Sequence, residues 1–253
     1  MLWSTVIRVR TCDVNSNDYL SSFRADGARI LSIADGDLGA PVPCCEGWTL
    51  GDLVGHVSMV LTMINTVVET GAPPAERPIV PEGPGVAAAC AEAFSRLDAT
   101  LAATDPDTEG WNWSSGPQQA AFWFRRVAHE LAIHRWDAEA VIGDCRPIDP
   151  VLASDGIDEW FDVFLRRGAG RSVTPINPGG TIHIHCTDTE GEWWAAMTDS
   201  EVELEREHKK GDVVARGGAS DLLLVLWGRQ DPSAVEVLGD APVLDAWIAA
   251  AGG

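Results

Sequence analysis

The sequence predicts a mixed fold, α + α/β, in which a bundle of four or five helices is followed by a small α+β domain. Apolar residues recur at helical spacings between residues 17 and 168. Gly, Pro and Asn then fill residues 168–180, and short alternating segments typical of strands follow. We therefore expect a helical domain over residues 15–168 and an α+β domain over residues 178–253.

The helices of the first domain are bounded by capping residues and breakers. The first is expected from Asn17 to about Leu38, with Ser16 or Asn17 as its N-cap. Thr49 and Asp52 form a capping-box pattern for the second, which ends before Gly71. The others are expected over about 86–103, over 121–143 with Pro117 near its first turn, and over 150–168.

The second domain should combine strands and helices. Strands are expected at Thr181–Cys186 and near residues 192–197, 202–205, 213–215 and 235–238, and helices from Ser220 or Asp221 to Trp227 and over 242–250. In the first strand His183 and His185 alternate with Ile182 and Ile184. A His-x-His pair can bind a metal, but here it opposes the apolar face, so we expect both histidines to be exposed to solvent.

Composition narrows the classes of partner. The chain has 253 residues and a formal net charge of −20, which repels nucleic acid and anionic membranes. No uninterrupted apolar run is long enough to span a bilayer, and the first ten residues do not resemble a secretory signal, so a cytoplasmic location is expected. The six cysteines lack CxxC spacing and are expected to be reduced thiols, with a reactive thiol at Cys44 or Cys45 the less favoured alternative.

A carboxylate and an imidazole on the helix at 121–143 suggest a metal site. Glu130 and His134 are four residues apart and share one face, which also carries apolar residues. Such a pair is more often solvated than metal-bound, but an ionisable pair facing an apolar interior needs compensation. Glu oxygen and His nitrogen are ligands suited to zinc or a similar divalent ion. His129 points about 100° away and is expected to be a surface or packing residue.

A third ligand is available on the second helix. His56 lies on the same face as Leu53 and Val60, so it should point toward the core. A lone core histidine is more often simply hydrogen-bonded. Two helices that present nitrogen and oxygen ligands toward one interior are nevertheless the arrangement from which bundle metal sites are built. We therefore predict a metal site formed by His56, Glu130 and His134, with one coordination position left open.

Several sequence blocks carry a family resemblance. They are PVPCCEGWTLGDLVGH at 41–56, FRRVAHELAIHRWDAEAVIG at 124–143, LASDGIDEW at 152–160, DLLLVLWGR at 221–229 and VLGD at 237–240. In this order they resemble the mycothiol-dependent maleylpyruvate isomerase family, whose N-terminal part is a DinB-like metal-binding bundle. The sequence departs from the family at Glu46, where the family usually has proline, and in its first 14 residues.

The resemblance implies a function and a set of site residues. It assigns a divalent metal, usually zinc, to His56, Glu130 and His134, and an arginine important for catalysis to Arg229. It implies mycothiol as thiol cofactor and a small electrophile as substrate, with cis-trans isomerisation through addition of a metal-bound thiolate. An alternative is a mycothiol S-transferase, which shares the metal and the thiol.

Two further hypotheses belong to other classes. One is a non-catalytic protein whose α+β domain binds a small apolar molecule. The other is a metal-dependent hydrolase that uses bound water as its nucleophile. The sequence does not separate these alternatives, and it gives no oligomeric state.

Overall fold

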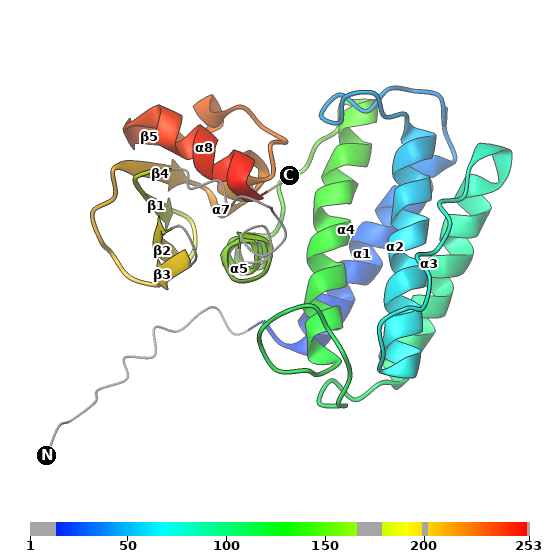
Figure 1. Cartoon of the computed structure of the whole chain (residues 1–253). Helices are drawn as coiled ribbons and strands as arrows, with labels where there is room; N and C mark the ends of the chain where they lie inside the picture. Colours follow the sequence, from blue (N-terminus) through cyan, green and yellow to red (C-terminus); the bar gives the residue numbers. More distant parts are fainter. Residues whose placement is uncertain (1–13, 166–178, 199–201, 252–253) are drawn as a thin grey trace, which may run out of the picture. The chain divides into compact units, whose positions relative to one another are not determined.

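The computed structural model describes residues 14–165, 179–198 and 202–251, and these form two units. The N-terminal unit spans Val14–Ile148 and the C-terminal unit begins at Asp149 (Figure 1). Two expectations lie outside the described residues: the assignment of residues 1–13, and the end of the fifth helix at Gly168.

The N-terminal unit is a bundle of four helices close to the predicted bounds. They are α1 (Ser16–Ala34), α2 (Leu50–Thr70), α3 (Val86–Ala103) and α4 (Ala121–Ile142). α1 packs along α4, α2 packs along α3, and α2 also contacts α4. This contact between α2 and α4 brings together the two helices on which metal ligands were predicted.

The caps follow the sequence signals with two changes. The capping box of Thr49 and Asp52 is confirmed, as is the left-handed Gly71 after α2. α1 is capped by Asn15, whose side chain accepts two backbone N–H groups, so its cap lies one residue before the predicted pair. Pro117 lies outside α4, which begins at Ala121. It belongs to the preceding loop, where its carbonyl accepts a hydrogen bond from the Asn112 side chain.

Among the described residues, α2 is the one helix that is long and apolar enough to span a membrane by length and hydropathy. The search for uninterrupted apolar runs did not predict such a helix, because Asp52 and His56 interrupt the apolar residues of α2. In the bundle its largest apolar side chains, such as Leu53 and Ile64, are fully buried. Packing against α3 and α4 therefore accounts for the hydropathy of α2.

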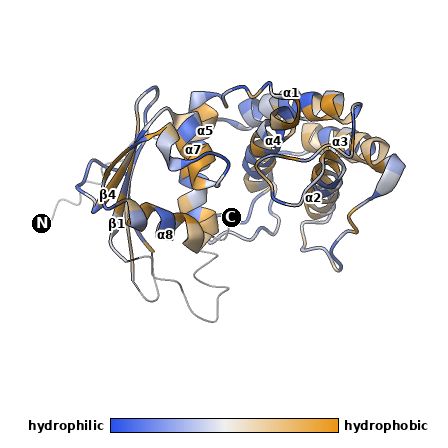
Figure 2. Ribbon diagram, turned by 90° about the horizontal axis from the view of Figure 1, so that it is seen from above, coloured by the Kyte–Doolittle hydropathy of each residue, from blue (hydrophilic) through white to orange (hydrophobic). Residues whose placement is uncertain are grey.

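In the described part of the C-terminal unit, three α-helices lie on one side of a five-stranded sheet (Figure 2). The strands are β1 (Thr181–Cys186), β2 (Glu192–Met197), β3 (Val202–Glu205), β4 (Val213–Gly217) and β5 (Glu236–Gly239), and their order is β3-β2-β1-β4-β5. β1 and β4 are parallel and the other pairs antiparallel. The helices are α5 (Pro150–Glu159), α7 (Ala219–Leu226) and α8 (Ala241–Ala251).

α5 was expected as a fifth bundle helix, but in the structure it belongs to the C-terminal unit. It packs against α7 and continues into a π-helical turn, Trp160–Leu165. The ring of Phe161 stacks on Trp193 of β2, and Asp158 accepts a bond from the Trp193 indole at 2.9 Å. The apolar face of α5 predicts that the helix is buried. It does not show whether α5 packs on the helical bundle or on the C-terminal unit. The division therefore falls at residue 149 rather than after residue 168.

One prediction about β1 is wrong. His183 was expected to be exposed, but it is only 3 % exposed, and the neighbouring His185 is half-buried. Period-two alternation assigns His183 to the face opposite Ile182 correctly. It does not show that this second face is covered at His183.

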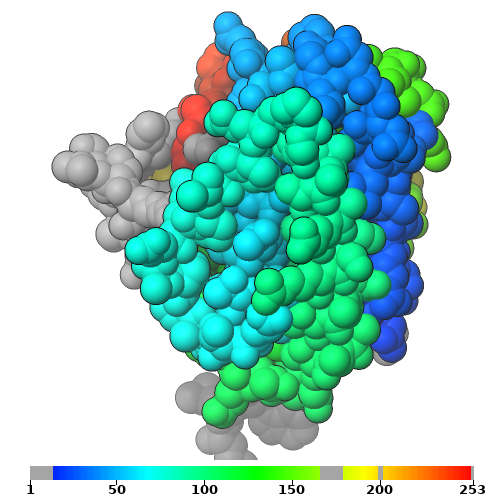
Figure 3. Space-filling view, turned by 90° about the vertical axis from the view of Figure 1, so that its right-hand side faces the viewer, coloured from blue at the N-terminus to red at the C-terminus, as the bar shows by residue number. Residues whose placement is uncertain are grey.

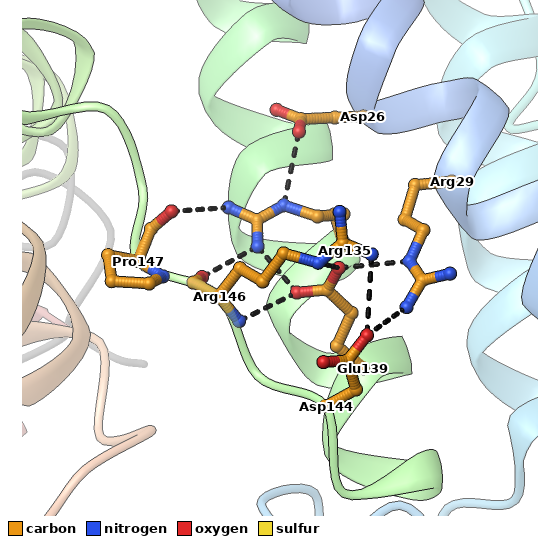
Figure 4. A network of polar contacts seen from close by, with 7 residues as sticks. All are labelled: Asp26, Arg29, Arg135, Glu139, Asp144, Arg146 and Pro147. Atoms are coloured by element: carbon orange, nitrogen blue, oxygen red, sulfur yellow. Dashed lines mark hydrogen bonds and ion pairs between the residues drawn. The ribbon is translucent and has the colours of Figure 1, made fainter.

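A buried carboxylate joins α1 and α4 to the chain that follows α4 (Figure 4). The side chain of Glu139 is fully buried and accepts bonds from Arg29 at 3.0 Å, Arg135 at 2.6 Å and the Arg146 backbone at 2.9 Å. Burial alone would raise the pKa of Glu139, but these donors outweigh it and hold the pKa below its usual value. The carboxylate is therefore ionised in the folded protein at neutral pH.

We predict that Glu139→Gln lowers the free energy of unfolding by about 3 kcal/mol, because it leaves two guanidinium groups without their buried partner. Urea titration at pH 7 measures the change. Since the folded-state pKa of Glu139 is depressed, its contribution is present above the unfolded pKa of about 4.3 and is lost as the pH falls. The difference between parent and variant should therefore shrink below about pH 4.

The matched control is Glu69→Gln, which removes an exposed ion pair with Arg96 at 3.1 Å. Its expected cost is about 0.5 kcal/mol. An equal loss of stability in the two variants would contradict a structural role for the buried carboxylate.

Candidate metal centre

Three side chains from α2 and α4 converge inside the N-terminal unit. Glu130 Oε1 lies 3.2 Å from His56 Nε2 and 3.2 Å from His134 Nε2. The two imidazole rings are 4.9 Å apart between centroids. The three donor atoms all lie within 4.8 Å of one another. This is the arrangement expected of a three-ligand site, and it brings together the three residues that the sequence analysis selected.

Local structure positions each of these donors. Glu130 and His134 are one turn apart on α4, so their side chains project from the same face. His56 lies in the second turn of α2, whose start is fixed by the capping box at Thr49. Trp48, just before that cap, lies against the His56 ring with centroids 5.3 Å apart. The side chains of His134 and Glu130 are 9 % and 16 % exposed, and His56 is more open at 28 %, so the site faces outward on the His56 side.

Two neighbours orient the candidate ligands. Asp137 Oδ2 lies 2.9 Å from Nδ1 of His134, which directs Nε2 of that ring toward Glu130. The second Glu130 oxygen accepts a bond from Arg126 at 2.8 Å. Carboxylates that hold the far nitrogen of a ligating histidine are a recurrent feature of zinc sites. Both residues lie at helical spacings of three or four from the ligand they support, so this signal was available in the sequence.

The electrostatics of the group favour an added positive charge. Burial lowers the pKa of His134, but hydrogen bonds with Asp137 and Glu130 outweigh it and raise the pKa to about 9. Burial raises the pKa of Glu130, and its bonds with His134, His56 and Arg126 hold it well below its usual value. A proton on His134 provides positive charge between the carboxylates of Glu130 and Asp137. A divalent cation would meet it with the same nitrogen and oxygen atoms, and this donor set fits zinc.

Two thiols lie beside this network. Cys44 donates a hydrogen bond to Asp137 Oδ1 at 3.1 Å, and Cys44, Cys45 and Asp137 form a second group with metal-ligand types. The hydrogen bond with Cys45, burial and the nearby Asp137 charge all raise the pKa of the Cys44 thiol. A protonated thiol is a poor nucleophile. The pKa therefore agrees with the sequence-based preference for an unreactive thiol.

A cavity of about 910 Å³ opens beside His56. Its wall includes Trp48, His56, Met59, Arg77, Val80 and Pro81. The segment that links α2 to α3 crosses α2 closely: a Cβ added at Gly55 would lie 2.5 Å from the Pro81 carbonyl oxygen. α3 and the segment before it form much of the face seen in Figure 3. The cavity wall also carries the charged side chains of Asp52, Glu82 and Arg77. Arg77 was not among the site residues predicted from the sequence.

Arg229 lies just beyond α7 in the C-terminal unit. Its side chain donates to the Trp227 carbonyl at 2.8 Å, and its backbone N–H bonds to Leu224. The guanidinium and the backbone N–H of Arg229 therefore cap carbonyl groups at the C-terminal end of α7. Its expected role in catalysis stays a prediction.

Comparison with known proteins identifies both units. Residues 20–139 match the mycothiol maleylpyruvate isomerase N-terminal domain, and residues 152–246 match the C-terminal domain of the same family. No curated protein matches the chain significantly. The fold is similar to the crystal structure of a mycothiol-dependent maleylpyruvate isomerase, with 17 % identity and a TM-score of 0.59 over 90 % of this chain and 95 % of that one. The structure of a histidine-to-alanine variant of that enzyme matches equally well. Since the two models together account for most of the chain in the family's order, this protein belongs to the mycothiol-dependent maleylpyruvate isomerase family.

Proposed function

We propose that this protein is a metal- and mycothiol-dependent enzyme that adds the thiolate to a small conjugated electrophile and catalyses a maleylpyruvate isomerase-like cis-trans isomerisation. The observation that carries the proposal is the convergence of His56, Glu130 and His134 beside an open cavity. Three protein donors leave a coordination position for an exogenous ligand, as in catalytic rather than structural zinc sites.

The chain's own residues would hold and shape this centre. A bound zinc ion would lower the pKa of a thiol so that it is a thiolate near neutral pH. Asp137 fixes the orientation of His134, and Arg126 holds the second oxygen of Glu130. The shared carboxylate thus stays ionised and aimed at the two imidazoles. Trp48 and Met59 form an apolar part of the cavity wall beside His56.

The substrate would be an acid with a conjugated double bond. Mycothiol at the site of His56, Glu130 and His134 would supply a thiolate whose reversible addition to that double bond permits rotation about it. Arg77 faces the cavity and is suited to a substrate carboxylate. We propose that Arg229 stabilises the negative charge that develops on the substrate.

The acidic chain, with a net charge of −20, favours small molecules over nucleic acid and membranes as partners. We propose a cytoplasmic location, in keeping with the low-molecular-weight thiol that the enzyme would use.

We predict that His134→Ala removes bound metal and lowers thiol-dependent turnover by at least about 100-fold, because two donors rarely hold zinc tightly. Elemental analysis of untagged protein purified without chelator measures the metal. Assays with mycothiol and a cis-enoyl acid measure turnover. Isomer formation supports the isomerase, whereas a stable thioether product would identify an S-transferase.

The control is His129→Ala, which removes another buried histidine of α4 that lies outside the ligand group. It should keep the metal. A His134→Ala protein that retains full metal and activity would refute the proposal, and turnover without any thiol would point to a hydrolase.

We predict that Asp137→Asn weakens metal affinity by about 10- to 100-fold while the three ligands remain, because the carboxylate that orients His134 is lost. Competition with a zinc chelator measures the affinity. Asp144→Asn, an exposed change just past the end of α4, is the control and should leave the affinity unchanged. Equal affinities in the two variants would exclude a positioning role for Asp137.

We predict that Arg229→Ala lowers kcat/KM by about 100-fold without loss of metal, in keeping with removal of one donor to developing charge. Arg229→Lys should recover part of the activity, since it keeps the charge but not the planar fork. Metal content and steady-state kinetics test this. Unchanged kinetics would leave Arg229 with its capping role alone.

A further inference from the structure

A second group of metal-ligand side chains lies in the C-terminal unit, on the face of the sheet opposite the three helices. It consists of His183 and His185 on β1, Glu192 on β2 and His208 in the loop between β3 and β4, and all four donor atoms lie within 4.8 Å of one another. Glu192 is the register partner of His185, and His183 is two residues from His185 on the same face. The sheet itself therefore places three of the four donors.

The four side chains meet at one carboxylate oxygen. Oε1 of Glu192 bonds to Nδ1 of His185, lies 3.0 Å from Nδ1 of His208 and 4.0 Å from Nε2 of His183. The centroid of the His183 ring is 5.0 Å from that of His208 and 6.1 Å from that of His185. In a tetrahedral zinc site with bonds of about 2.1 Å, donor atoms are separated by about 3.4 Å. The separations of Glu192 Oε1 from His208 Nδ1 and His183 Nε2, 3.0 and 4.0 Å, lie on either side of that value.

His183 gives the independent sign that a ligand belongs here. Its side chain is 4 % exposed, and its Nε2 atom is fully buried and has no hydrogen-bond partner among the described residues. Leaving such a buried polar atom unpaired destabilises the folded protein.

The loop that carries His208 is held in place over the sheet. The ammonium group of Lys209 lies 3.4 Å from the centre of the Trp194 ring and pairs with Glu205 at 2.7 Å. The Trp194 indole donates to the Lys210 carbonyl at 3.2 Å. A Cβ added at Gly211 would lie 2.9 Å from the His183 backbone nitrogen, so the loop packs directly on β1. The cation–π contact and the hydrogen bond to Lys210 thus hold the backbone that directly follows His208.

We propose that His183, His185, Glu192 and His208 form a second divalent-metal site, selective for zinc or a similar transition metal. Three imidazole nitrogens and one carboxylate oxygen are donors of the type zinc prefers, and four protein donors make a closed, structural site. The ion would tie β1 and β2 to the β3–β4 loop. This site shares no residue with the candidate centre of the N-terminal unit, so each is tested separately.

The test compares zinc stoichiometry in untagged full-length protein. The parent and the double variant His185→Gln/His208→Gln are stripped with chelator, dialysed against zinc in the presence of a weak competing chelator, and analysed for metal. The replaced side chains are 30 % and 77 % exposed, so the fold should persist. We expect the double variant to bind one equivalent less than the parent. Equal zinc content would overturn the proposal.

A second pair of variants checks the carboxylate. Glu192→Gln should lose one zinc equivalent, whereas Glu203→Gln, an exposed change on neighbouring β3, should lose none. Adding zinc to His134→Ala should still raise the Tm, because that variant keeps the second site. The same addition should leave the Tm of the triple variant His134→Ala/His185→Gln/His208→Gln unchanged. A zinc-dependent rise that persists in the triple variant would contradict the assignment.

The two proposals fail in different ways. Loss of one equivalent only in His134→Ala would support the catalytic centre and exclude the sheet site. Loss only in the double variant would support the sheet site and exclude the catalytic centre.

Discussion

The N-terminal unit depends on the neutralisation of charges buried along α4. This helix buries a run of ionisable side chains in the bundle: Arg126, His134, Arg135, Asp137 and Glu139. Unpaired, each of them would cost several kcal/mol. Each of these side chains instead forms an ion pair or hydrogen bond with a residue one turn away on α4 or on a neighbouring helix. Arg135 pairs with Glu139 on its own helix and with Asp26 of α1, for example.

The candidate metal centre is part of the same pattern. Arg126, Glu130 and His134 follow one another at intervals of four along α4, as Arg135 and Glu139 do on another side of the helix. The difference lies in what completes each set. Arginines from α1 and the following loop pair with Glu139, whereas Glu130 lies beside His56, whose imidazole borders a cavity. A helix with repeated charged pairs thus supplies both a structural lock and a site open to a ligand.

Sequence reasoning reached most of the fold because helical and strand periods report which face is buried. It selected His56, Glu130 and His134 because spacing on two helices determines direction, and Asp137 could have been added on the same ground. It missed what depends on tertiary neighbours. The apolar face of α5 does not specify its packing partner. The buried His183 side chain lies beside the ring of His208, 5.0 Å away between centroids, which comes from the β3–β4 loop. Lys209, next to His208, contacts the Trp194 ring, and no local pattern encodes such a tertiary contact.

The close crossing at Gly55 bears on how such a protein could change its chemistry over evolution. The Pro81 carbonyl rests where any larger residue at position 55 would need room, one residue before His56. A side chain there would push the connecting segment away and so change the shape of the cavity. A substitution at this one glycine could therefore alter which small molecules fit beside His56 without replacing any of the three candidate ligands.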